Sequence, residues 1–127
     1  MMGAMKTWLF IAAINGGLAV GAGAFAAHGL KARLDADALS VFETGARYHM
    51  YHALAMGLAA LAGRGAARER ATIAAAFFLA GTILFSGSLY LMALTGQSAL
   101  GIVTPVGGVA FLAGWIFLGL AALKLQP

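Results

Sequence analysis

The sequence predicts an all-α membrane protein, a four-transmembrane-helix bundle with its N and C termini in the cytoplasm. Hydrophobic residues make up 62% of the 127 residues and charged residues only 9%, and a soluble core of this size cannot bury so much apolar surface. Four stretches approach the roughly 20 apolar residues that cross a bilayer. We expect one integral membrane domain over residues 1–127, with helices near residues 7–27, 37–63, 71–95 and 104–124.

The first predicted helix, residues 7–27, contains no charged residue. Its start resembles a signal peptide with an Ala-rich cleavage point, and we expect it to be retained as a membrane helix. Asn15 lies on a face of small residues, and its amide is expected to bond to another helix rather than to a ligand. Four-residue spacing of small residues favours close helix packing, and it is found for Ala12, Gly16 and Val20, for Gly17 and Gly21, and for Ala19 and Gly23.

The second predicted helix, residues 37–63, is the only one with ionisable side chains inside its span. Asp35 or Asp37 is placed to cap its amino terminus. Because successive residues are rotated by about 100°, Glu43 and Arg47 share one face with three leucines. The leucines are Leu54, Leu58 and Leu61. We expect this face to contact lipid and the membrane–water interface.

The opposite face of this helix is expected to meet other helices. At about 100° of rotation per residue, Tyr48 and His52 fall on this face together with the small residues Ala55 and Ala59. His52 is therefore predicted to point into the bundle. His49 is offset from this face and is the less favoured of the two histidines.

The short connection over residues 63–70 sets the predicted orientation. It is strongly basic, and short basic loops stay in the cytoplasm. This places both termini inside as well. The inner side then carries five basic residues, and the outer side carries three. The inner residues are Lys6, Arg64, Arg68, Arg70 and Lys124, and the outer residues are Lys31, Arg33 and Arg47.

The third predicted helix, residues 71–95, becomes polar in its outer third. Thr82, Ser86 and Tyr90 recur every four residues and so share one stripe. Their hydroxyls either bond to carbonyls one turn earlier or line a shared polar cavity.

The fourth predicted helix is expected to begin with Thr104 as the capping residue before Pro105. Trp115 falls at the membrane midplane, where it is expected to fill the core and to need an acceptor for its indole N–H, such as a backbone carbonyl or Asn15. Small residues form a close-packing seam along this helix, namely Gly107, Ala110, Gly114 and Ala121.

Polar side chains gather in the outer half of the predicted bundle. Ionisable groups inside a membrane indicate a functional site by default. The alternative is a hydrogen-bonded polar plug that only fixes helix register. The candidate binding residues are His28, Arg47, Tyr48, His52, Ser86, Ser88, Tyr90 and Thr104.

No catalytic or metal-binding residue is predicted, and no cofactor. The chain has no cysteine, which excludes thiolate metal sites and a Cys nucleophile. His28, His49 and His52 offer imidazoles to zinc, copper or haem iron, but no carboxylate or cysteine accompanies them at motif spacing. A hydrolase using a serine with His52 is disfavoured because Glu43 lies on the wrong side of the helix to orient the imidazole.

Three stretches together resemble a known family: GAFAAHGLKARL at residues 23–34, FETGARYHMYHALA at 42–55, and FSGSLYLMALTG with IVTPVGGVAFLAGW at 85–96 and 102–115. The resemblance is to the domain of unknown function 423 family of small four-helix membrane proteins, related to transmembrane protein 256, and it covers nearly the whole chain. It implies a multi-pass protein of the bacterial cytoplasmic (inner) membrane and brings no established activity.

The candidate binding residues all match the pattern of this family. The chain departs from the pattern at Ala26, where Gly is usual, and at His49, where Gln is usual. The second departure further weakens a metal site that uses His49.

We expect an uncharacterised, non-enzymatic membrane protein whose outer-half polar pocket binds a lipid or another amphipathic molecule, or docks a membrane partner. A small dimeric transporter of a hydrophobic or cationic solute is the alternative, although such exporters need a membrane-embedded carboxylate. Expected partners are membrane lipids, a second copy of the chain or another membrane protein. Nucleic acid is not expected, because the basic residues form no stripe with interleaved aromatic residues.

Overall fold

Every regular element within residues 2–127, the part of the chain that this computed structural model describes, is a helix. This confirms the predicted all-α fold class. The five α-helices are α1 (Met2–Phe25), α2 (Ala36–Ala62), α3 (Arg68–Gly81), α4 (Gly87–Thr95) and α5 (Val103–Ala122). They are joined by the π-helical turns η1 (Ala26–Leu30) and η3 (Thr82–Ser86) and by the 3-10 turns η2 (Gly65–Ala67) and η4 (Ser98–Ile102).

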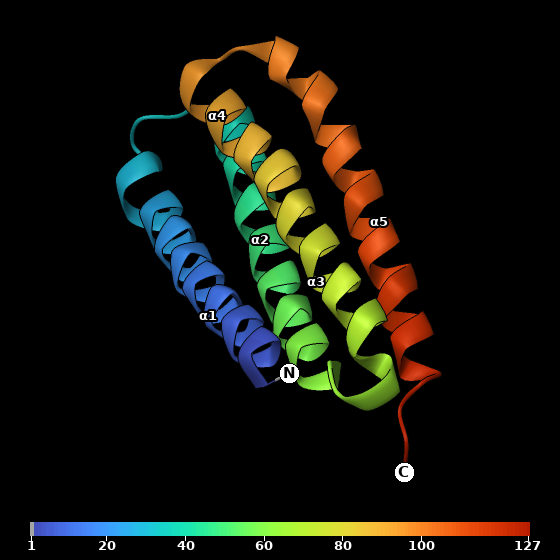
Figure 1. The fold of residues 1–127 in the computed structure, drawn as a ribbon. Coiled ribbons are helices and arrows are strands. Elements are labelled where there is room, and N and C mark those ends of the chain that lie inside the picture. Colours follow the sequence, from blue (N-terminus) through green and yellow to red (C-terminus); the bar gives the residue numbers. More distant parts are fainter. Residues whose placement is uncertain (1) are drawn as a thin grey trace.

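The helices form four rods that run up and down in alternation (Figure 1). The first rod is α1 with η1, the second is α2, the third is α3, η3 and α4 in one line, and the fourth is α5. Both ends of the chain lie at the same end of the bundle. We call this the inner end, and we call the opposite end, which carries η1 and η4, the outer end.

The second rod is the central one. α2 packs against α1 on one side and against α3 and α4 on the other, and α3 packs along α5. A rod with neighbours on two sides can bury polar side chains that an outer rod would expose. The polar residues of α2 are therefore held between helices.

Three rods are long and apolar enough to cross a membrane: Gly3–Leu30, Gly65–Thr95 and Ser98–Ala122. α2 is not one of them, because polar residues such as Arg47, His49 and His52 lie within it. Its 27 residues nevertheless make a helix about 40 Å long.

The cap and the outward face of α2 agree with the predictions. The Asp35 side chain accepts a hydrogen bond of 2.8 Å from the Ala38 N–H, so Asp35 is the N-cap. Glu43 and Arg47 are exposed, as predicted. The leucines on this face are also exposed, at 64% for Leu54, 55% for Leu58 and 56% for Leu61.

Glycines allow the third and fourth rods to approach closely, as predicted for the seam of α5. A Cβ at Gly107 would lie 2.3 Å from the Phe85 backbone nitrogen, and one at Gly114 would lie 2.6 Å from Phe78 Cδ1. Ala121, farther along the seam, is completely buried. Backbone and ring atoms occupy the space that side chains would need at these two positions of the seam, so glycine is favoured at both.

The small residues of α1 behave differently from the prediction. Ala12 packs into a cluster with Ala55, Met56 and Ala59 of α2, and Ala19 is also buried. Four glycines, however, have open space where a Cβ would point, and these are Gly16, Gly17, Gly21 and Gly23. The close packing predicted for these glycines is therefore wrong within this chain, because α1 has its main neighbour, α2, on one side.

The start of α5 also differs from the prediction. The helix begins at Val103, with Ile102 as the N-cap residue and the 3-10 turn η4 before it. Thr104 therefore lies inside the helix, and its predicted capping role is wrong. Its hydroxyl instead forms a 2.6 Å hydrogen bond with Ser88 Oγ of α4.

Candidate functional site

His52 lies in the interior, as predicted, and only 5% of its side chain is exposed. Its Nδ1 is 2.8 Å from the Tyr48 carbonyl oxygen, and the Trp115 indole N–H donates to its Nε2 at 3.1 Å. A carbonyl only accepts and an indole N–H only donates. His52 is therefore the neutral imidazole with its proton on Nδ1, and both of its ring nitrogens are occupied.

Aromatic rings enclose this imidazole. It stacks on Phe111 with ring centroids 3.5 Å apart and planes 6° from parallel. Phe78 lies 5.7 Å from it and Trp115 lies 6.0 Å from it, edge-on. Tyr48 lies beside it, with its ring nearly parallel to the imidazole and the ring centroids 6.2 Å apart. Helices α2, α3 and α5 thus meet around one buried polar ring.

Trp115 is not the core filler that the sequence predicted. Its side chain is 44% exposed at the surface of the bundle. The predicted need for an acceptor is met by His52 rather than by Asn15 or a carbonyl. The indole thus binds the buried imidazole with its N–H and presents the rest of its ring outward.

His49 forms a second buried group, which the sequence did not favour. Its side chain is 6% exposed and bonds to Tyr90 Oη and Asn15 Oδ1, both at 2.9 Å. Asn15 Nδ2 donates to the Ile11 carbonyl, so its Oδ1 must be the acceptor. His49 Nε2–H therefore donates to Asn15, and Tyr90 O–H donates to His49 Nδ1. This chain of bonds ties α1, α2 and α4 together and confirms the inter-helix bond predicted for Asn15.

Of the three hydroxyls in the predicted stripe, only that of Thr82 follows one of the two predicted alternatives, and the other two bond across to α2. Thr82 donates back to the Phe78 carbonyl one turn earlier. Ser86, which is completely buried, donates across to the Gly45 carbonyl of α2 at 2.8 Å. Glycine at position 45 favours this close approach, because a Cβ there would lie 3.0 Å from the Tyr90 ring and 3.3 Å from Leu89 Cβ, which is tighter than ordinary contact.

Ser88 and Thr104 form a third pair. Ser88 Oγ donates to the Phe85 carbonyl at 2.9 Å, so the Thr104 hydroxyl is the donor in the 2.6 Å bond between the two side chains. Among the residues that the structure describes, no buried side-chain nitrogen or oxygen lacks a hydrogen-bond partner. The interior polar groups are bonded to one another or to backbone carbonyls, as a polar plug requires, and we call the buried side chains of His49, His52, Ser86 and Ser88 the polar plug.

The structure places the candidate binding residues in several locations. His28 and Arg47 are exposed, and Arg47 bonds to Thr44 Oγ1 at 3.2 Å. Tyr48 is 38% exposed but packs on His52. The other six candidates make contacts inside the bundle or at its edge, in four separate groups. Tyr48 packs with His52, and Ser88 bonds to Thr104. Ser86 bonds to the Gly45 carbonyl, and Tyr90 bonds to His49.

His49 is the residue that sequence reasoning missed. The available signal was Asn15, an amide that needed a partner on another helix. Tyr90 was a second polar group in the same part of the bundle. A histidine bonded on both sides is the simplest way to pair them.

The described residues contain no group of three or more His, Asp or Glu side chains placed to hold a metal ion. His49 and His52 use all four of their ring nitrogens in bonds within the chain.

A groove of about 460 Å³ lies beside the polar plug, on the surface between α4 and α5. Its walls are mainly aliphatic and come from η3, α4, η4 and α5. Gly87 leaves open space on this surface, and Ser88 and Tyr90 contribute the polar edges. The aliphatic residues are Ile83, Leu84, Leu91, Leu100 and Val103.

A family model described as a protein of unknown function (DUF423) matches residues 22–108. The UPF0382 membrane protein YwdK of Bacillus subtilis (strain 168) is 47% identical over 121 residues, which cover 94% of this chain and 98% of that protein. The UPF0382 inner membrane protein YgdD of Escherichia coli (strain K12) is 42% identical over 123 residues, which cover 93% of this chain and 90% of that protein. No solved structure matches the chain.

Proposed function

We propose, since the chain belongs to the DUF423 family, whose relatives are membrane proteins, that it is a multi-pass lipid-binding protein that holds a phospholipid acyl chain. The proposed site is the groove between α4 and α5. The polar plug beside the groove would fix the register of the helices that form its walls. The single observation that carries this proposal is an aliphatic groove of about 460 Å³ between two rods that are apolar enough to cross a membrane.

The chemistry of the groove favours an acyl chain over a polar ligand. Its aliphatic walls belong to the spans Gly65–Thr95 and Ser98–Ala122, and in a bilayer the molecules that reach such a surface are lipid chains. The Ser88 hydroxyl is already bonded to Thr104 and to the Phe85 carbonyl. The only donor proton of Ser88 is therefore already used within the chain.

Filling the groove tests this proposal. Gly87→Leu is expected to lower acyl-chain occupancy about tenfold, the ratio for a loss of roughly 1.4 kcal/mol of binding, because the added side chain enters open space in the groove. The measurement is photo-crosslinking in vesicles to a phosphatidylcholine with a diazirine in its acyl chain, with cross-linked peptides identified by mass spectrometry.

Gly119→Leu is the matched control for this experiment. Gly119 also has open space around a Cβ but lies outside the groove. Its variant should cross-link at the groove as the unchanged chain does. Cross-links spread evenly around the whole bundle, or an equal loss in both variants, would show that the lipid is only annular and would refute the proposal.

We also propose that all four rods cross the cytoplasmic (inner) membrane, with both termini in the cytoplasm. The length of α2 and the position of both termini at one end of the bundle support four crossings. The excess of basic residues at that end supports the orientation.

Single cysteines test this topology without background, because the chain has none of its own. A membrane-impermeant maleimide is expected to label Arg33→Cys and Gln97→Cys on intact spheroplasts, and Ala66→Cys only after permeabilisation. Arg33 and Ala66 lie at opposite ends of α2. Labelling of both from the same side would mean that α2 does not cross.

A further inference from the structure

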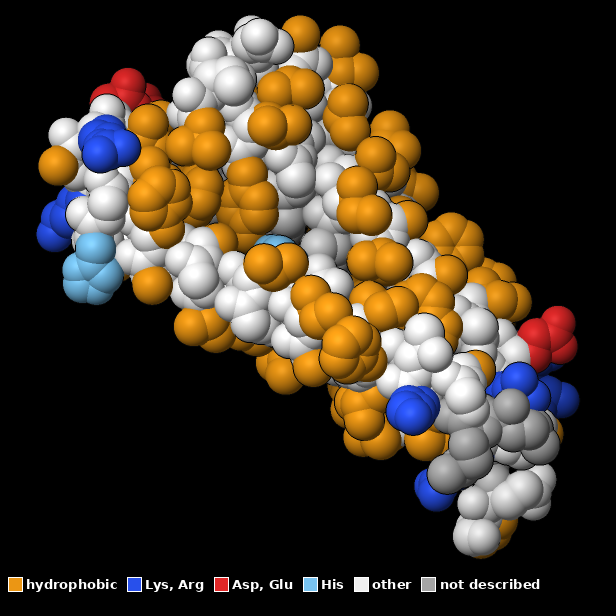
Figure 2. All heavy atoms as spheres, turned by 60° about the vertical axis from the view of Figure 1, so that its left-hand side comes forward, with side chains coloured by type: hydrophobic (Ala, Val, Ile, Leu, Met, Phe, Trp, Pro, Cys, Tyr) orange, Lys and Arg blue, Asp and Glu red, His pale blue; other side chains and the backbone are white. Residues whose placement is uncertain are grey.

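The charges of the chain are distributed very unequally between the two ends of the bundle. The inner end carries five basic residues and one acidic residue, Glu69, whereas the outer half carries three basic and three acidic residues. The entire formal net charge of +4 therefore belongs to the inner end. Figure 2 shows Lys and Arg side chains gathered there around one acidic group, while both signs mix at the other end.

The cationic end contains a cavity. A space of about 400 Å³ lies between the turn at Gly65–Ala67 and the segment that follows α5, and its lining includes Arg64 and Lys124 but no acidic side chain. Gly65 has a φ of 57°, in the left-handed region that glycine adopts readily, and this turn brings Arg64 beside the carboxy-terminal segment. Residues 60 positions apart in the sequence thus supply two cations to one cavity.

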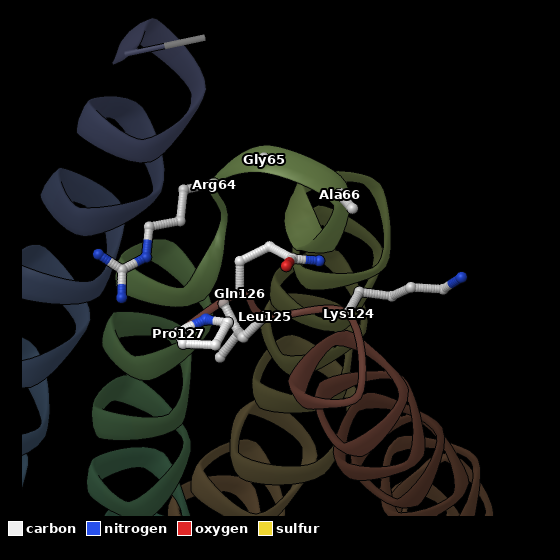
Figure 3. Close-up of a pocket in the computed structure, with 7 residues that line it drawn as sticks. All are labelled: Arg64, Gly65, Ala66, Lys124, Leu125, Gln126 and Pro127. Carbon is white, nitrogen blue, oxygen red and sulfur yellow. The ribbon is translucent and has the colours of Figure 1, made fainter.

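Figure 3 shows how these side chains lie. Arg64 and Lys124 lie on opposite sides of the cavity with their charged ends directed away from each other, and the Gln126 carboxamide lies between them beneath Gly65 and Ala66. The positive charges therefore stand around the rim, and a neutral hydrogen-bonding group stands in the middle. Lys6, in the first turns of α1, is also exposed at this end.

We propose that this cavity binds the phosphate headgroup of an anionic phospholipid in the membrane leaflet that faces the inner end. Phosphate is the chemistry that cationic side chains and an amide recognise together. The lipid is favoured over a free anion because the cavity lies at the ends of apolar rods, where headgroups are concentrated. Basic residues at this level attract anionic lipid. The site is at the opposite end from the acyl-chain groove and does not depend on it.

Removal of the two rim charges tests the proposal in the full chain. Arg64→Gln with Lys124→Gln is expected to weaken the binding of phosphatidylglycerol about fivefold for each cation removed. Native mass spectrometry of the protein released from nanodiscs of equimolar phosphatidylcholine and phosphatidylglycerol measures the lipid retained. The unchanged chain should retain phosphatidylglycerol in preference to phosphatidylcholine.

Two further variants separate charge at this site from charge in general and from folding. Lys31→Gln with Arg33→Gln removes the same charge from the outer half and should leave the preference unchanged. Arg64→Lys with Lys124→Arg keeps the charge and should also preserve it. Full retention in the Arg64 and Lys124 glutamine variant, or an equal loss in the Lys31 and Arg33 variant, would overturn the proposal.

A last comparison distinguishes the lipid from a free anion. Phosphatidylglycerol is expected to raise the thermal unfolding temperature of the detergent-solubilised chain, whereas inorganic phosphate is not. An equal rise with inorganic phosphate would assign the cavity to a soluble phosphate and refute the lipid headgroup.

Discussion

Replacing His52 by alanine is expected to lower the free energy of unfolding by about 3–5 kcal/mol, the range for removing a large buried ring. The imidazole is stacked on Phe111 and surrounded by other rings, so its loss leaves a cavity between α2 and α5. It also removes the acceptor of the Trp115 N–H. Unfolding by dodecyl sulfate in mixed micelles, followed by circular dichroism, measures the change.

His28→Ala is the matched control, because it is the same substitution at an exposed histidine. It should change the free energy of unfolding by no more than about 0.5 kcal/mol. If the two variants were equally stable, His52 would not hold α2 and α5 together. A change in Trp115 fluorescence in the His52 variant should accompany the loss of stability.

Gly107→Ala is expected to destabilise the bundle by about 1–3 kcal/mol, the usual range for overpacking. The new methyl group would lie 2.3 Å from the Phe85 nitrogen and 2.8 Å from its Cα. These are backbone atoms of η3, which cannot rotate away as a side chain can. The third and fourth rods must separate to admit the methyl group, and the same unfolding measurement detects this.

The neighbouring residue provides the control. A Cβ at Gly108 would meet its nearest atom, Phe85 Cδ2, at 4.0 Å, which is ordinary contact. Gly108→Ala is therefore expected to be neutral or stabilising by up to about 1 kcal/mol, as alanine generally is in a helix. Equal destabilisation by both substitutions would mean that helix propensity, not close approach, determines the effect at position 107.

Much of the fold was predictable because it depends on local sequence. Apolar length located three of the four rods, side-chain chemistry narrowed the cap of α2 to Asp35 or Asp37, and rotation by about 100° per residue separated the outward leucines of α2 from its buried face. The packing of α1 was not predictable in this way. In a membrane protein, lipid-facing and helix-facing positions are both apolar, so the pattern of glycines from Gly16 to Gly23 does not reveal which side has a neighbour.

The burial of His52 was predictable, but its hydrogen-bond partners were not. Intramembrane polarity correctly indicated that His52 is buried. Its bond to Trp115 depends on how α5 is placed against α2, which no local pattern specifies. The burial of His49 was underestimated because a helical-wheel projection was used to assign α2 a single inward face. α2 has neighbours on two sides and buries both His49 and His52.

The π-helical turn at Thr82–Ser86 gives the third rod a property that a uniform helix lacks. Such a turn holds one more residue than an α-helical turn, so everything beyond it is advanced by about 100° around the axis. Ser88 and Tyr90 meet Thr104 and His49 only in this phase. The number of residues in this segment, and not only their identity, is therefore part of what the chain encodes: if the same residues formed a uniform α-helix, the whole outer portion of the rod would turn away from its neighbours.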